Sequence, residues 1–111
     1  MSENYKKRRL AVIPARGGSK RIHKKNIKPF LGEPIILRVL KEVTESNLFT
    51  EIHVSTEDKE IAEIVSNAGY KIKFLRDENL SGDTTPLSDV LNQVVMKYKD
   101  LGESFETIAL I

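Results

Sequence analysis

A basic, glycine-rich segment from Pro14 to Asn26 contains the residues best suited to chemistry. Its two adjacent glycines, Gly17 and Gly18, let the backbone approach an anion closely and point N–H groups at it. Three cationic side chains flank or follow these glycines: Arg16, Lys20 and Lys25. Main-chain N–H groups together with spaced cations are what a nucleoside triphosphate requires. The segment therefore predicts a phosphate-binding loop.

The segment differs from two well-known phosphate-binding loops. A P-loop needs lysine directly after its second glycine, whereas Ser19 separates Gly18 from Lys20. The dinucleotide-binding fingerprint needs spaced glycines, and here the two glycines are adjacent. A glycine-rich turn without any ligand is the simpler alternative, but it does not account for the spaced cations.

The elements that would position this segment alternate between strand and helix. The segment follows an apolar run at residues 9–14, which predicts a buried parallel strand, and in open α/β sheets ligands bind beyond the carboxyl ends of strands. Apolar residues at helical spacing predict helices over residues 34–46, 57–67 and 86–98. Further strands are predicted at residues 51–55, 71–75 and 105–111. This order predicts an α/β fold, a three-layer α/β/α sandwich with a mostly parallel sheet.

Composition excludes several classes of protein. The chain has 111 residues, of which 40% are hydrophobic and 31% charged, so it is neither a disordered tail nor a membrane span. It has no cysteine, which excludes disulfides and thiolate metal sites. No apolar stretch is long enough for a leader peptide, and we expect a cytoplasmic protein without a membrane partner.

Charge is distributed unevenly along the chain. Residues 1–28 contain ten Lys or Arg and one acid, while the remainder contains eight Lys or Arg and fifteen acids. We interpret residues 1–8 as a basic tail and residues 9–111 as a nucleotide-binding portion of a larger domain. The basic block predicts a polyanionic partner. Nucleic acid is one such partner, but the block offers no aromatic stacking platform and no helix-turn-helix, so we do not expect nucleic-acid binding.

The residues from Ile13 to Ile22, together with Lys25-Asn26 and the stretch from Lys28 to Ile36, resemble the N-terminal signature of the acylneuraminate cytidylyltransferases, the CMP-sialic acid synthetase family. Further matches are Val54-Ser55-Thr56, and Phe74-Leu75-Arg76 before Leu80-Ser81. Within the family, the first motif is similar to the pseudaminic acid cytidylyltransferases. The resemblance implies a Rossmann-like fold of the nucleotide-diphospho-sugar transferase type. It also implies transfer of CMP from CTP to a nine-carbon acidic sugar, with release of pyrophosphate.

The resemblance also implies a role for individual residues. Three cations match triphosphate-binding positions with a catalytic part in charge neutralisation: Arg16, Lys20 and Lys25. Gly17, Gly18 and Ser19 match the loop whose backbone surrounds the phosphates, and Asn26 and Arg76 match positions that contact the cytidine. The family's reaction needs Mg²⁺, and its members form homodimers.

Three departures from the family pattern matter. His23 stands where the family has proline, and residues 83–86 follow the family's nucleotide loop only loosely. The family's metal ligands and dimer segment match no residue of this sequence. We therefore expect a truncated chain that is inactive as an isolated enzyme. His53, within a predicted strand, is expected to be structural. A nucleotidyltransferase for an eight-carbon sugar remains an alternative.

Overall fold

The computed structural model describes residues 8–16, 29–30, 33–82 and 84–111. Three parallel strands form its main sheet in the order β4-β1-β5: β1 is Arg9–Pro14, β4 is Glu51–Ser55 and β5 is Thr107–Leu110. β1 occupies the centre, with Val12 opposite His53 on one side and Leu110 on the other. Its continuous apolar run is explained by this position, because a central parallel strand is covered on both faces.

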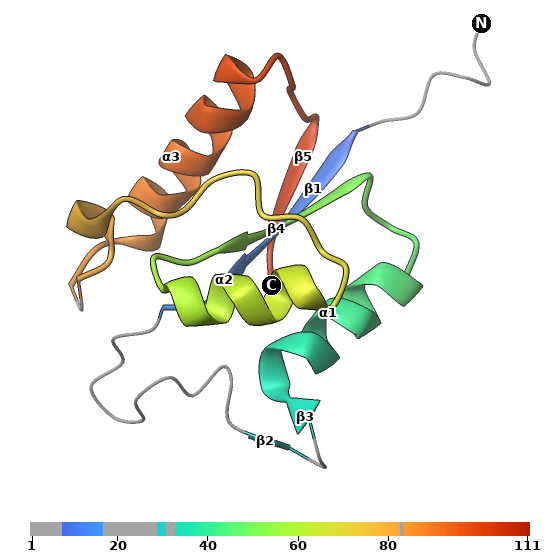
Figure 1. Cartoon of the computed structure of the whole chain (residues 1–111). Helices are drawn as coiled ribbons and strands as arrows, with labels where there is room; N and C mark the ends of the chain where they lie inside the picture. The colour runs from blue at the N-terminus through green and yellow to red at the C-terminus, as the bar shows by residue number, and fades with distance from the viewer. Residues whose placement is uncertain (1–7, 17–28, 31–32, 83) are drawn as a thin grey trace, which may run out of the picture.

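Three helices cover the sheet in two layers, as Figure 1 shows. α1 (Ile35–Glu45) and α2 (Lys59–Asn67) lie on one face, and α3 (Leu87–Asp100) lies on the other. Side chains of β1 alternate accordingly: Ala11 and Ile13 join the core beneath α1 and α2, while Leu10 and Val12 join the core beneath α3. The predicted three-layer α/β/α sandwich with a parallel sheet is therefore confirmed.

The short segment before α1 forms a separate antiparallel pair. β2 (Pro29–Phe30) pairs with β3 (Glu33–Pro34), and α1 follows directly. The three helices occupy the predicted regions with ends that differ by one or two residues. α2 begins at Lys59 rather than at residue 57 because Asp58 caps it, and α3 ends at Asp100 rather than at residue 98. Gly69 follows α2 with φ +99°, a conformation that glycine adopts without strain.

The predicted strand at residues 71–75 is absent from the described part of the chain. Ile72 packs against the core beneath α1 and α2, whereas Phe74 packs against the core beneath α3. Residues two apart in a regular strand lie on the same face, so this segment does not alternate as a strand does. An open groove of about 410 Å³ is lined by residues of this segment and of β4, among them Lys73, Glu51 and Ile52. The prediction of a strand at residues 71–75 is therefore wrong.

β5 also differs from its prediction. We expected a buried strand over residues 105–111, but the strand covers only Thr107–Leu110 and lies at the edge of the described sheet. Its apolar residues remain partly exposed, including Ile108 and Leu110. An apolar run is therefore an insufficient signal for a central strand. Among the described residues, no helix is long and apolar enough to cross a membrane.

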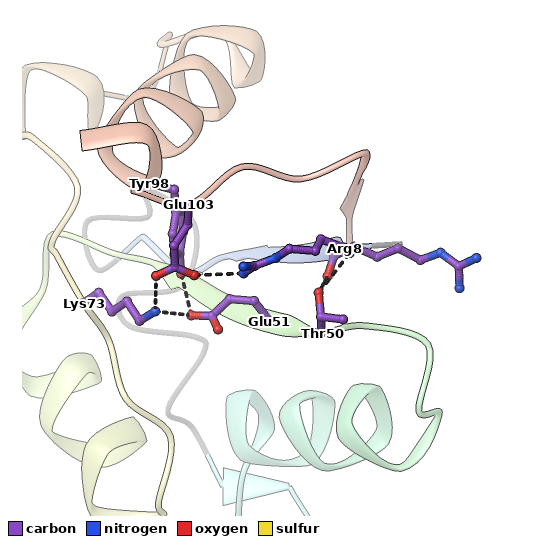
Figure 2. Close-up of polar contacts among 7 residues, drawn as sticks. Arg8, Thr50, Glu51, Lys73, Tyr98 and Glu103 are labelled. Carbon is purple, nitrogen blue, oxygen red and sulfur yellow. Dashed lines mark hydrogen bonds and ion pairs between the residues drawn. The ribbon is translucent and has the colours of Figure 1, made fainter. Parts of the chain in front are cut away.

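A charged cluster joins the elements at the amino-terminal end of the sheet (Figure 2). Lys73 Nζ lies between Glu103 Oε2, at 2.8 Å, and Glu51 Oε2, at 3.1 Å. Arg8 binds the other oxygen of Glu103 at 2.9 Å, and the hydroxyl of Tyr98 donates to Glu51. The hydrogen bond from Lys73 lowers the pKa of Glu103, and the one from Arg8 adds to this effect. The cluster fixes the end of α3 to β4, at the end of the sheet opposite to the one where β1 leads into Arg16.

Candidate functional site: the carboxyl ends of β1 and β4

The candidate site lies where β1 and β4 end side by side. Parallel strands bring their carboxyl ends to one edge of the sheet, which is where α/β proteins bind ligands. Ala15 N–H donates to the Ser55 carbonyl at 2.9 Å, so the pairing of the two strands continues one residue beyond β1. Arg16 follows at once, and its side chain is half-buried at this edge. The predicted phosphate-binding segment therefore begins at the carboxyl end of β1, as expected.

Arg76 enters the same edge from the segment after residue 75. Its side chain is only 6% exposed. Its Nε donates to Ser55 Oγ at 3.0 Å, and one terminal NH₂ group donates to the Ser55 carbonyl, also at 3.0 Å. Its main-chain N–H donates to the Thr56 carbonyl at 2.7 Å. A residue 21 positions away in sequence is therefore anchored firmly to the end of β4.

Two arginines converge at this edge. The guanidinium of Arg16 donates to the Ser81 carbonyl at 3.2 Å, so it also holds the loop that follows the short helix η2 (Glu78–Leu80). Burial lowers the pKa of Arg76; the nearby charge of Glu57 raises it and that of Arg16 lowers it. Arginine remains protonated despite such shifts. Two cations placed this close favour a multiply charged anion between or beside them.

The start of α2 is close in sequence to this edge, but main-chain N–H groups of its first turn already have a hydrogen-bond acceptor. Asp58 Oδ1 accepts from the main-chain N–H groups of Glu60 and Ile61, at 2.8 and 3.1 Å. The Asp58 N–H in turn donates to Thr56 Oγ1 at 3.1 Å. Because these first-turn donors have an internal partner, α2 is not a phosphate-binding helix end. The cations of the edge, not this helix, provide its positive potential.

Several predicted site residues lie outside the described residues, so only Arg16 and Arg76 can be placed. The others are Gly17, Gly18, Ser19, Lys20, Lys25 and Asn26; His23 and Asp83 also lie outside. Among the described residues, no group of three or more His, Cys, Asp or Glu could hold a metal ion. The described residues thus offer no cluster that could hold a metal ion by protein ligands alone, and the Mg²⁺ implied by the resemblance stays a prediction.

Reasoning from sequence overlooked two contributors to the site. Ser55 and Ser81 stand only within stretches that resemble the family, and neither is predicted from the sequence to hold an arginine. The position of Ser55 was a usable signal, because it is a polar residue at the last position of a buried strand. Ser81 gave no comparable signal, since it contributes its main-chain carbonyl, which any residue type could supply.

Comparison with known proteins adds an independent line of evidence. A family model described as cytidylyltransferase matches residues 10–102. The pseudaminic acid cytidylyltransferase of Campylobacter jejuni subsp. jejuni serotype O:2 is 43% identical over 86 residues, which cover 78% of this chain and 37% of that protein. The CMP-N,N'-diacetyllegionaminic acid synthase of Legionella pneumophila subsp. pneumophila is 35% identical over 102 residues, covering 92% of this chain and 44% of that protein.

A solved structure gives the same result for the fold. CMP:2-keto-3-deoxy-manno-octonic acid synthetase, in complex with CTP, superimposes with a TM-score of 0.69 at 28% sequence identity. The match covers 81% of this chain and 35% of that structure. This chain thus spans less than half the length of each of these three proteins.

Proposed function

Because the chain belongs to the cytidylyltransferase family, whose model matches residues 10–102, we propose that it binds CTP at the carboxyl ends of β1 and β4. The observation that supports this site is the convergence of Arg16 and Arg76 there. The bound nucleotide would donate CMP to a nine-carbon acidic sugar. The sugar's anomeric oxygen forms a bond to the α-phosphorus of CTP, the bond from that phosphorus to pyrophosphate breaks, and the hydroxyl proton is released.

The residues of this chain contribute positioning and charge neutralisation to that reaction. We propose that Arg16 binds phosphate oxygens, because its planar guanidinium can bind two of them at once. Negative charge grows on the departing pyrophosphate, and a fixed cation stabilises it. Lys20, Lys25 and the backbone of Gly17, Gly18 and Ser19 are proposed to complete the phosphate site. Arg76 and Asn26 are proposed to contact the cytidine. No step here is assigned to a metal.

The proposal is tested by titrating CTP into the protein and into Arg16→Ala. Removing a phosphate-binding arginine should weaken CTP binding by about tenfold or more. Binding by the unaltered protein should also weaken as salt is raised, because phosphate contacts are screened. Lys41→Ala is the matched control, since Lys41 is an exposed cation on α1. Equal affinity for CTP in Arg16→Ala and in the unaltered protein would contradict the site.

We propose pseudaminic acid as the sugar, supported by the 43% identity to the Campylobacter enzyme. Pyrophosphate release by the protein expressed from the complete gene, with CTP and a panel of acidic sugars, tests this choice. Release with pseudaminic acid supports it. Release with the eight-carbon sugar alone would contradict it and favour the activity named for the solved structure.

A further inference from the structure

Ser55 is in contact with Arg76 through two different atoms. Its hydroxyl accepts from Arg76 Nε and its carbonyl accepts from a terminal NH₂ group, both at 3.0 Å. The same carbonyl accepts from Ala15 N–H at 2.9 Å. Ser55 has no exposed surface. One buried residue therefore joins the end of β1 to the guanidinium of Arg76.

These contacts determine the orientation of the whole Arg76 side chain. Its main chain is held by the Thr56 carbonyl at 2.7 Å, and its guanidinium is held at two points by Ser55. Two hydrogen bonds to one edge of a planar group exclude rotation of that plane. The directions of its remaining N–H bonds are consequently fixed before any ligand arrives.

The partners at Ser55 are neutral, which matters for ligand binding. A carboxylate in the same place would bind the guanidinium in the same two-point manner but would cancel its charge. The hydroxyl and carbonyl of Ser55 accept hydrogen bonds from two N–H donors of the guanidinium and leave its charge in place. Ser55 thus orients Arg76 without offsetting its charge, and the nearby negative charge comes from Glu57 instead, at the edge where Arg16 also lies.

We propose that Ser55 is a positioning residue for selection of the nucleotide base, acting through Arg76. The inference rests on the proposed function, in which Arg76 contacts the cytidine. Cytosine presents two adjacent acceptors, O2 and N3, whereas uracil carries a hydrogen on N3. Arginine can only donate, so a guanidinium in fixed orientation favours cytosine. A guanidinium that is free to rotate can find another uracil oxygen and discriminates less.

The test is the ratio of the dissociation constants for UTP and CTP in Ser55→Ala. Losing the hydroxyl should reduce this ratio about tenfold, while binding of inorganic tripolyphosphate stays within about twofold of the unaltered protein. Ser55→Thr, which retains a hydroxyl, should restore most of the preference. The matched control is Thr50→Ala, which removes a hydroxyl that exchanges two hydrogen bonds with the Arg9 main chain at the opposite end of β4.

A double-variant experiment separates positioning from a general loss of structure. If Ser55 acts through Arg76, then adding Ser55→Ala to Arg76→Lys should not reduce base preference further. Additive losses would overturn the inference, as would an unchanged ratio in Ser55→Ala. Parallel losses of CTP, UTP and tripolyphosphate binding would also overturn it, because they indicate a structural role. If the unaltered protein showed no preference for CTP, the proposed function would fail first and this inference with it.

Discussion

At the scale of single residues, His53 shows how burial determines the state of a titratable group. Its imidazole stacks on Phe74, with ring centroids 4.3 Å apart, and meets the edge of Tyr98 at 5.6 Å. Its Nδ1 is buried and has no hydrogen-bond partner among the described residues. Burial lowers the pKa of His53 to about 4, and the charges of Arg76 and Lys73 add to the shift. The expectation that His53 is structural agrees with this core position.

Stability should therefore depend on pH through His53. In the unfolded chain the imidazole titrates near its ordinary pKa of 6.5, whereas the folded protein keeps it neutral down to about 4. Between these values protons bind the unfolded state, so the free energy of unfolding should fall as pH decreases from 6.5 to 4. The slope should reach at most about 1.4 kcal/mol per pH unit.

Urea unfolding at several pH values checks this prediction, with His53→Gln and His53→Leu as companions. Neither replacement titrates, so both should flatten the slope above pH 4.5, although their stabilities at pH 7 will differ. The lowered pKa of Glu103 acts in a different window, because its contribution is lost below the ordinary carboxyl range. An unchanged slope in both variants would assign the pH dependence to other groups.

At the scale of elements, the start of α2 depends on one side chain. From their residue types alone, Glu57 and Asp58 at a predicted helix start are expected to favour the helix dipole. The structure shows a more specific role for Asp58, whose carboxylate accepts two main-chain hydrogen bonds from the first turn. Glu57 precedes the helix, and its charge acts on Arg76 instead. Two adjacent acidic residues thus have different roles: Asp58 caps the helix, and Glu57 acts on the candidate site.

Asp58→Ala should reduce the free energy of unfolding by about 1 kcal/mol, because two first-turn N–H groups lose their acceptor. Asp58→Asn keeps a side-chain oxygen at the cap and should lose much less. Thermal or urea unfolding of the two variants at one pH gives the comparison. If Asn were as harmful as Ala, the charge of Asp58 and its interaction with the dipole would be the dominant effect.

At the scale of the whole molecule, β5 presents an edge to solvent. It pairs with β1 on one side and ends the order of the described sheet. Ile108, Leu110 and Ile111 are 37%, 43% and 48% exposed along it. An exposed apolar edge strand pairs readily with another chain, because its main-chain groups and side chains both lack cover. The 111-residue chain should therefore self-associate through this edge.

Sedimentation over a range of concentrations tests the association. Leu110→Lys should shift the protein toward monomer, since a charge on an edge strand opposes pairing. Met96→Lys is the matched control: Met96 is 59% exposed but lies on α3. If both substitutions shifted the equilibrium equally, overall charge rather than the β5 edge would be responsible. A monomer at all concentrations in the unaltered protein would contradict the prediction.

Features that depend on local patterns could be predicted from the residues of one segment. The apolar run of β1 and the helical spacing in α1, α2 and α3 predicted these elements with ends correct to within two residues. Their alternating order predicted a parallel sheet between two helical layers, since parallel strands need crossover connections. It also indicated that chemistry would follow β1, because the end of that strand is the start of the basic, glycine-rich segment.

Features that depend on distances between remote segments could not be predicted in this way, because they arise from how the elements pack. Whether residues 71–75 form a strand depends on pairing with a neighbouring strand, which their own residue types do not encode. The burial of Arg76 and its fixed orientation arise from Ser55, 21 residues earlier, and Arg16 reaches a main-chain carbonyl 65 residues away. Such contacts depend on how the layers pack and not on the residue types along one element. For this reason, residue types at strand ends predicted where the site lies, but not which groups orient it.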